Sequence, residues 1–159
     1  MQASRRTLAT ILAMAVVLMA APAGAGGATV ARGAFETFAD GPTLGYDVSG
    51  VASMVRTADG KTIVSVNVTG LIPGANYGSH VHNQTCAEGS AGGHYRFDGP
   101  VAGGALDGFE IWPGPFKANP AGNAHGKTTV HATAGADAVS VVIHAPAPTS
   151  QKIACADLS

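Results

Sequence analysis

Polar and apolar residues alternate in several short segments of the chain. Residues 62–69 (TIVSVNVT) alternate valine with serine, asparagine and threonine, the period of two expected for a half-buried strand. A turn signal at Asp59 and Gly60 precedes this segment, so residues 45–56 and 62–69 are predicted to form a β-hairpin. Further strands are predicted at residues 77–83, 128–132 and 138–144.

The remaining pattern favours turns over helices. Residues 99–124 are rich in Gly, Pro and Asn and are predicted to be mostly loop. No amphipathic helix and no internal repeat is visible in the sequence. Several short strands with frequent turn signals predict an all-β fold, an antiparallel β-sandwich or barrel.

Composition supports one compact, turn-rich domain. The chain has 159 residues, of which 46% are hydrophobic, 12% are charged and 22 are glycine. This length suits a single domain, and the normal apolar content argues against disorder driven by charge. The net charge of −1 excludes nucleic-acid binding through a basic patch as the default function.

The N-terminal segment has the pattern of an export signal. Arg5 and Arg6 precede an apolar run over residues 7–21, and Ala23 and Ala25 supply the small residues of a cleavage site. The run is too short to cross a ~30 Å hydrocarbon core permanently. We therefore expect a signal peptide at 1–25, a mature domain at 26–159, and a secreted or cell-envelope location without a membrane anchor.

The export route is left open by the same residues. The arginine pair fits a twin-arginine signal, which carries folded proteins, but a basic pair also occurs in ordinary signals.

The sequence contains two cysteines, Cys86 and Cys155. An even number of cysteines in an exported chain predicts one intrachain disulfide. The spacing has no local C-x-x-C pair, so a metal site built on these thiols is not expected.

Four histidines carry the candidate chemistry. His80 and His82 lie two residues apart on a predicted strand, which places both rings on one face. His94 follows a Gly-rich turn, and His144 ends the predicted strand 138–144. Three or four imidazoles form a donor set that suits copper. The other two histidines, His125 and His131, have no partner at ligand spacing and are expected to be exposed.

These segments together resemble the copper/zinc superoxide dismutase family. The matching stretches are GSHVH at 78–82, SAGGHY at 90–95, VVIH at 141–144 and IAC at 153–155. The resemblance implies a Greek-key sandwich or barrel of about eight strands, with Cys86 and Cys155 as the family's disulfide. It also implies that His80, His82, His94 and His144 hold copper, His94 being the ring that bridges to zinc in the full family.

Two departures resemble the copper-only branch of that family. Residues 95–124 contain no histidine, so a complete zinc site is not expected, and residues 145–154 are too few for the long charged loop that roofs the copper. In the copper-only branch a carboxylate replaces zinc in holding the bridging imidazole. Glu110 is our candidate acceptor for the second ring N–H of His94; the alternative is an ordinary exposed loop glutamate.

The resemblance also gives Lys152 a candidate role. Lys152 aligns with the family's arginine near copper, which attracts and orients superoxide. Lysine keeps the positive charge but lacks the planar fork of arginine, so slower turnover is expected. The alternative is a solvated lysine near the C-terminus.

The resulting hypothesis is an exported copper-dependent enzyme that converts superoxide into oxygen and hydrogen peroxide, with His94 and Lys152 in catalysis. It is expected to act as a monomer, with a dimer as the alternative. A second hypothesis is a non-enzymatic copper-binding or buffering module on the same fold, and a third is an envelope domain that a metal only stabilises. Trp112 and Phe116 are expected to pin the Pro-rich loop to the domain.

Overall fold

The computed structural model describes residues 27–103 and 107–159. The expected signal peptide, residues 1–25, lies outside the described residues. Within them are nine β-strands and one short 3-10 helix, Pro42–Leu44, and no α-helix. No helix in this part of the chain is long and apolar enough to cross a membrane.

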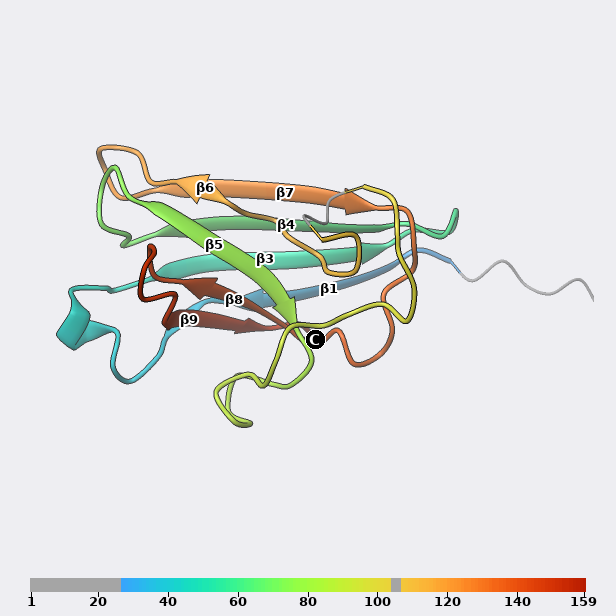
Figure 1. Ribbon diagram of the computed structural model, residues 1–159, viewed down its shortest axis with the longest axis horizontal. Helices are drawn as coiled ribbons and strands as arrows, with labels where there is room; N and C mark the ends of the chain where they lie inside the picture. Colours follow the sequence, from blue (N-terminus) through green and yellow to red (C-terminus); the bar gives the residue numbers. More distant parts are fainter. Residues whose placement is uncertain (1–26, 104–106) are drawn as a thin grey trace, which may run out of the picture.

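The strands form two antiparallel sheets stacked as two layers (Figure 1). The four-stranded sheet has the order β1 (Thr29–Ala34), β3 (Ser49–Arg56), β4 (Thr62–Thr69), β7 (Ala124–Val130). The five-stranded sheet has the order β2 (Glu36–Thr37), β9 (Lys152–Asp157), β8 (Ser140–His144), β5 (Asn76–His82), β6 (Phe116–Lys117). The all-β prediction is confirmed, as a sandwich and not as a closed barrel.

Connections between the sheets bring distant segments together. β4 and β7 are hydrogen-bonded neighbours, although β5 and β6, which lie between them in the chain, belong to the other sheet. Such a crossover is the kind found in Greek-key sandwiches. It leaves β5 and β8 side by side in the five-stranded sheet, and these two strands carry three of the four candidate histidines.

The predicted hairpin is confirmed, whereas several strand limits differ from the prediction. β3 pairs with β4 from Ser49 opposite Thr69 to Arg56 opposite Thr62. β7 begins at Ala124, four residues before the predicted start, because the long β4 offers pairing as far as Val68. β9 was not predicted: its four central residues are all buried, so no polar–apolar alternation marks it.

The hydrophobic core lies between the two sheets. Every second residue of β4 faces inward, and alternate residues of β5 and β8 meet them from the other sheet. The fully buried side chains include Met54, Val64, Val66, Tyr77, Val81, Val141 and Ile143. Because these residues occupy the inner faces of β5 and β8, the outer faces of the same strands carry His80, His82 and His144.

Cys86 and Cys155 form the predicted disulfide. It joins the loop that follows β5 to β9, and the Asp157 carboxylate accepts the Cys86 backbone N–H at 2.7 Å beside it. Ala91 and Val142 pack with Cys155 in a small cluster on the outer face of the sheet. A structural disulfide indicates an oxidising compartment.

Replacing Cys86 and Cys155 together with serine should lower the free energy of unfolding by about 4 kcal/mol. The disulfide spans 69 residues of sequence, and the chain-entropy model assigns about that value to such a loop. Urea unfolding of the double variant against wild type measures the change. Equal midpoints would contradict the expected contribution.

Candidate metal centre

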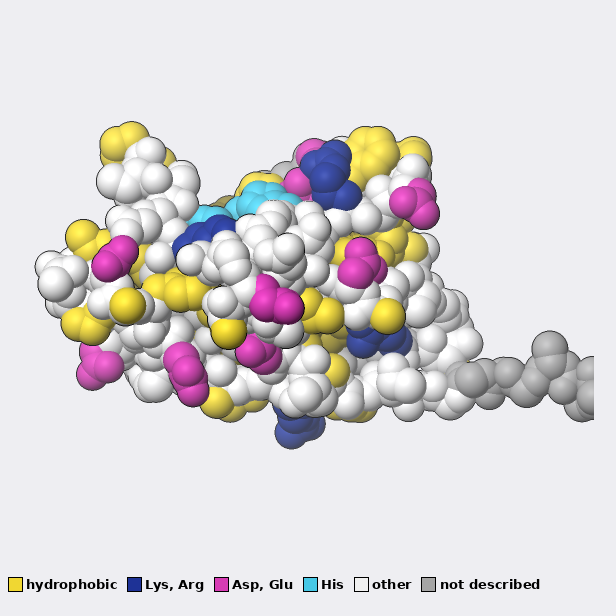
Figure 2. All heavy atoms as spheres, turned by 90° about the horizontal axis from the view of Figure 1, so that it is seen from below, with side chains coloured by type: hydrophobic (Ala, Val, Ile, Leu, Met, Phe, Trp, Pro, Cys, Tyr) yellow, Lys and Arg dark blue, Asp and Glu magenta, His cyan; other side chains and the backbone are white. Residues whose placement is uncertain are grey.

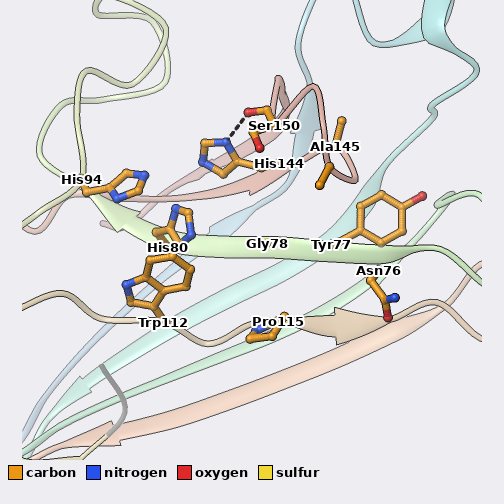
Figure 3. A pocket seen from close by; sticks show the side chains of 11 residues that line it. Asn76, Tyr77, Gly78, His80, His94, Trp112, Pro115, His144, Ala145 and Ser150 are labelled. Carbon is orange, nitrogen blue, oxygen red and sulfur yellow. Dashed lines mark hydrogen bonds between the residues drawn. The ribbon is translucent and has the colours of Figure 1, made fainter. Parts of the chain in front are cut away.

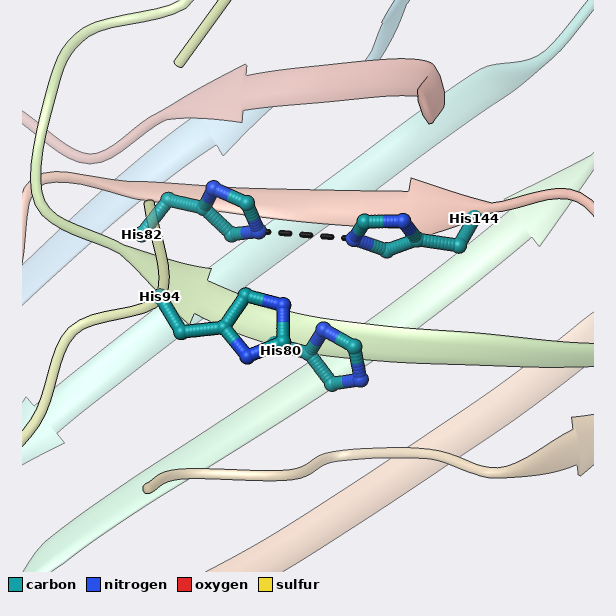
Figure 4. Close-up of side chains that lie close together, drawn as sticks. All are labelled: His80, His82, His94 and His144. Carbon is teal, nitrogen blue, oxygen red and sulfur yellow. Dashed lines mark hydrogen bonds between the residues drawn. The ribbon is translucent and has the colours of Figure 1, made fainter. Parts of the chain in front are cut away.

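The structure brings His80, His82, His94 and His144 into one cluster (Figure 4). One ligand nitrogen from each ring can be chosen so that all lie within 4.8 Å of one another. His80 and His82 project from the same face of β5, and His144 ends the neighbouring β8. His94 arrives from the following loop, through an isolated β-bridge to His82.

Hydrogen bonds to backbone carbonyls hold two of these rings, His82 and His144, with one nitrogen directed inward. Nδ1 of His82 lies 3.1 Å from the Ala91 carbonyl, and Nδ1 of His144 lies 2.8 Å from the Ser150 carbonyl. A carbonyl only accepts, so each Nδ1 must carry the proton and each Nε2 a lone pair. The two Nε2 atoms face each other at 3.4 Å, a separation that two lone pairs tolerate only poorly without a cation between them.

The two ring nitrogens of His80 have no partner in the described part of the protein. Both of its ring nitrogens are buried and neither makes a hydrogen bond. The ring lies against Trp112 at 3.8 Å and against His94 at 4.0 Å between centroids. A buried ring nitrogen without a partner costs free energy. A metal ion bound by His80 would give one of these nitrogens a partner, so the environment of His80 fits a metal ligand.

Burial favours the neutral form of three rings of the cluster, His80, His82 and His144. Desolvation, followed by the neighbouring imidazoles, lowers the pKa of His80 to about 2, and desolvation lowers the pKa of His82 to about 3. The pKa of His144 is also lowered, first by desolvation. Neutral imidazole is the form that binds metal ions, so these three rings are prepared to act as ligands.

Glu110 is buried at 6% exposure and contacts His94. Its Oε2 accepts hydrogen bonds from Nδ1 of His94 at 2.7 Å and from Nε1 of Trp112 at 2.9 Å, and its Oε1 accepts from Arg96. The contact expected between Glu110 and His94 is therefore present, and Glu110 is not an exposed loop residue. Nε2 of His94 is left free for the cluster.

Three residues around Glu110 were not assigned to the site from the sequence. Arg96 pairs with Asp107 at 2.9 Å, and the Asp107 carboxylate accepts the backbone N–H groups of Phe109 and Glu110. Trp112 was expected to pin the loop to the domain; it packs against His80 of β5 and also donates from Nε1 to Glu110.

The sequence spacing of Arg96 and Trp112 could have indicated that they lie near the site. His94 and Arg96 are two residues apart, as are Glu110 and Trp112, and Arg96 pairs with Glu110 in a β-bridge. The same spacing of two placed His80 and His82 on one face. Phe116 behaves as expected and stacks on Tyr77 in the core.

Lys152 is tied to the loop that carries His94. A register irregularity between Ile143 and His144 places Lys152 opposite His144. The ammonium donates to the carbonyls of Ser90, at 2.8 Å, and Gly92. Lys152 is half-buried, and desolvation lowers its pKa. It is therefore not a freely solvated terminal lysine.

A pocket of about 600 Å³ opens beside the cluster (Figure 3). His80, His94 and His144 line it together with Trp112 and the 145–150 loop. In Figure 2 histidine side chains are visible at the base of a hollow on this face. A small molecule can therefore approach the cluster from solvent on the side of His94, the least buried of the four rings.

His125 and His131 are exposed and lie outside the cluster, as expected. Nδ1 of His125 bonds the Asn67 side chain at 2.8 Å.

Comparison of the chain with models of known protein families gives no match, and comparison with curated protein sequences gives none either. The resemblance to the copper/zinc superoxide dismutase family stays a prediction. What the structure establishes is a cluster of four histidines that could hold a metal ion.

The metal-free protein should lose stability as the pH falls below about 6.5. The folded pKa values of His80 and His82 lie far below 6.5, so the unfolded chain binds more protons and acid favours unfolding. Each of these two histidines should lower the free energy of unfolding by up to about 2 kcal/mol as the pH falls from 6.5 to 5. Urea unfolding across this range measures the slope, which His80→Asn should reduce and His125→Gln, at an exposed histidine, should leave unchanged. An unfolding free energy of the wild type that does not change between pH 6.5 and 5 would contradict this prediction.

Proposed function

We propose that the protein is an exported copper-dependent superoxide dismutase, which converts two superoxide ions and two protons into oxygen and hydrogen peroxide. The observation that carries the proposal is the four-histidine cluster, with inward lone pairs and access from a pocket. An all-imidazole donor set suits copper. The resemblance of four separated sequence motifs to those of the copper/zinc superoxide dismutase family supports the same choice.

His80, His82, His94 and His144 would hold the metal. When bound, copper supplies one-electron chemistry by alternating between two oxidation states. The Ala91 and Ser150 carbonyls keep His82 and His144 in the tautomer that offers Nε2. This fixed second contact on each ring raises its basicity and limits its rotation.

His94 is suited to move a proton. It is the least buried of the four rings, with 32% of its side chain exposed, and Glu110 accepts from its Nδ1, which leaves Nε2 directed toward the cluster. Nε2 can hold either the metal or a proton, and a proton held there while the metal is not bound to it would give an imidazolium that donates from Nδ1 to the Glu110 carboxylate. Because peroxide formation consumes two protons, His94 can deliver one while Glu110 keeps the ring in place.

Glu110 would replace zinc in positioning His94. It contributes a negative charge on the side of the ring where a zinc-containing relative has a metal, and Arg96 and Trp112 fix the direction of the carboxylate. Lys152 adds a positive charge close to His82 and His144 that would attract an anion.

Export is supported by two independent features. The disulfide indicates an oxidising compartment, and the N-terminal sequence has the three parts of a signal peptide.

The direct test is superoxide decay after pulse radiolysis, using the mature chain loaded with copper and no zinc. We expect fast catalytic decay that disappears in metal-free protein and falls strongly in His94→Asn. His131→Asn, at an exposed histidine outside the cluster, is the matched control and should retain the wild-type rate. Background decay with copper verifiably bound would instead support a binding or buffering module.

Replacing Glu110 with glutamine should lower copper(II) affinity about 10- to 100-fold, the range typical for partners of metal ligands. Glutamine keeps the size of the side chain but removes the charge that faces His94 and Arg96. Competition with a chelator of known affinity measures the change. Asp98→Asn makes the same charge change at an exposed position and should leave affinity unaltered; equal losses in both variants would contradict a specific role.

A further inference from the structure

The loop before His94 contains a turn of left-handed helix. Gly89, Ser90, Ala91 and Gly92 have φ values of 51°, 54°, 67° and 60°, and the Gly92 N–H bonds the Gly89 carbonyl at 3.3 Å. Glycine adopts such a conformation freely, but Ser90 and Ala91 do so against the contact between Cβ and the backbone. This left-handed turn, residues 89–92, therefore needs stabilisation from outside itself.

The carbonyls of the left-handed turn serve the metal centre and Lys152. The Ala91 carbonyl accepts Nδ1–H of His82, and the carbonyls of Ser90 and Gly92 both accept from the Lys152 ammonium. One cation thus holds the residues on either side of Ala91. The Ala91 methyl group is fully buried against Val142 and the disulfide, so its side chain cannot move outward.

Backbone strain of this kind is confined to the metal centre in the described part of the chain. Three non-glycine residues there have positive φ: Ser90, Ala91 and Ser150. Two of them, Ala91 and Ser150, are the residues whose carbonyls accept from His82 and His144. Strained backbone persists only where its surroundings over-determine it, which is common at functional sites.

We propose that Lys152 is a positioning residue for His82, acting through the left-handed turn. The ammonium gathers the Ser90 and Gly92 carbonyls, keeps Ala91 left-handed, and so keeps the Ala91 carbonyl on Nδ1 of His82 and Nε2 directed into the cluster. This role is separate from anion attraction. It rests on the metal-binding part of the proposed function and not on dismutation.

The test combines removal of the ammonium with relief of the strain. Lys152→Met keeps the length of the side chain but donates nothing, and it should lower copper(II) affinity about 10- to 100-fold and alter the electron paramagnetic resonance spectrum. Adding Ala91→Gly, which tolerates the same φ, should restore most of the affinity and the spectrum. Ala87→Gly, an exposed position in the same loop but outside the turn, should restore neither.

Two results would overturn the proposal. Unchanged copper affinity and spectrum in Lys152→Met, with slower superoxide decay, would show that Lys152 acts through anion attraction alone. Weaker copper binding that Ala91→Gly fails to restore would show that the turn is not the link. If Lys152→Met does not fold, Lys152→Leu, which likewise carries no donor, permits the same comparison.

A readout on the metal-free protein separates this proposal from the proposed function. The ¹⁵N shifts of the His82 ring report its tautomer, and wild type should hold the proton on Nδ1 whether or not copper binds. Lys152→Met should mix the tautomers, and Ala91→Gly in that background should return them to Nδ1–H. An unmixed tautomer in Lys152→Met would overturn the proposal even if the chain proves to have no dismutase activity.

Discussion

The candidate metal centre depends on which nitrogen of each imidazole carries the proton. An Nδ1–H that donates outward leaves an Nε2 lone pair facing inward, and three acceptors impose this arrangement on His82, His144 and His94: two backbone carbonyls and the Glu110 carboxylate. Without these acceptors the rings could rotate or exchange tautomers, and four histidines in proximity would not form a site ready for a metal ion.

The two faces of the five-stranded sheet have different roles. Inward-facing residues of β5 and β8, such as Tyr77, Val81 and Val141, fill the core between the sheets, while the alternate residues place imidazoles on the outer face. The pairing of β5 with β8 therefore sets the separation of His80, His82 and His144, and the packed core keeps that pairing in place. The disulfide extends this rigidity to the loop carrying Ala91 and His94, which has little regular structure of its own.

Around His94 the protein uses a hydrogen-bonded carboxylate where a larger metal centre would use a second ion. Glu110 accepts from His94, Trp112 and Arg96, and Asp107 balances the arginine while binding backbone N–H groups next to Glu110. These three donors fix the direction of the Glu110 carboxylate. The arrangement orients one imidazole and still leaves its Nε2 free.

The sequence by itself determined the all-β class, the β3–β4 hairpin, the disulfide and the four histidines, because period-two spacing, turn residues and rare cysteines act locally or by count. Glu110 could be named from the sequence through resemblance to a family. Lys152 was named in the same way, but only the tertiary structure showed its contacts with the Ser90 and Gly92 carbonyls and the positions of Arg96 and Trp112 beside Glu110. Arg96 and Trp112 reach the site because a β-bridge joins segments fourteen residues apart, and Lys152 reaches it because a register irregularity turns it toward His144. Such contacts depend on long-range pairing and on left-handed backbone at Ala91 and Ser150, which side-chain patterns do not encode.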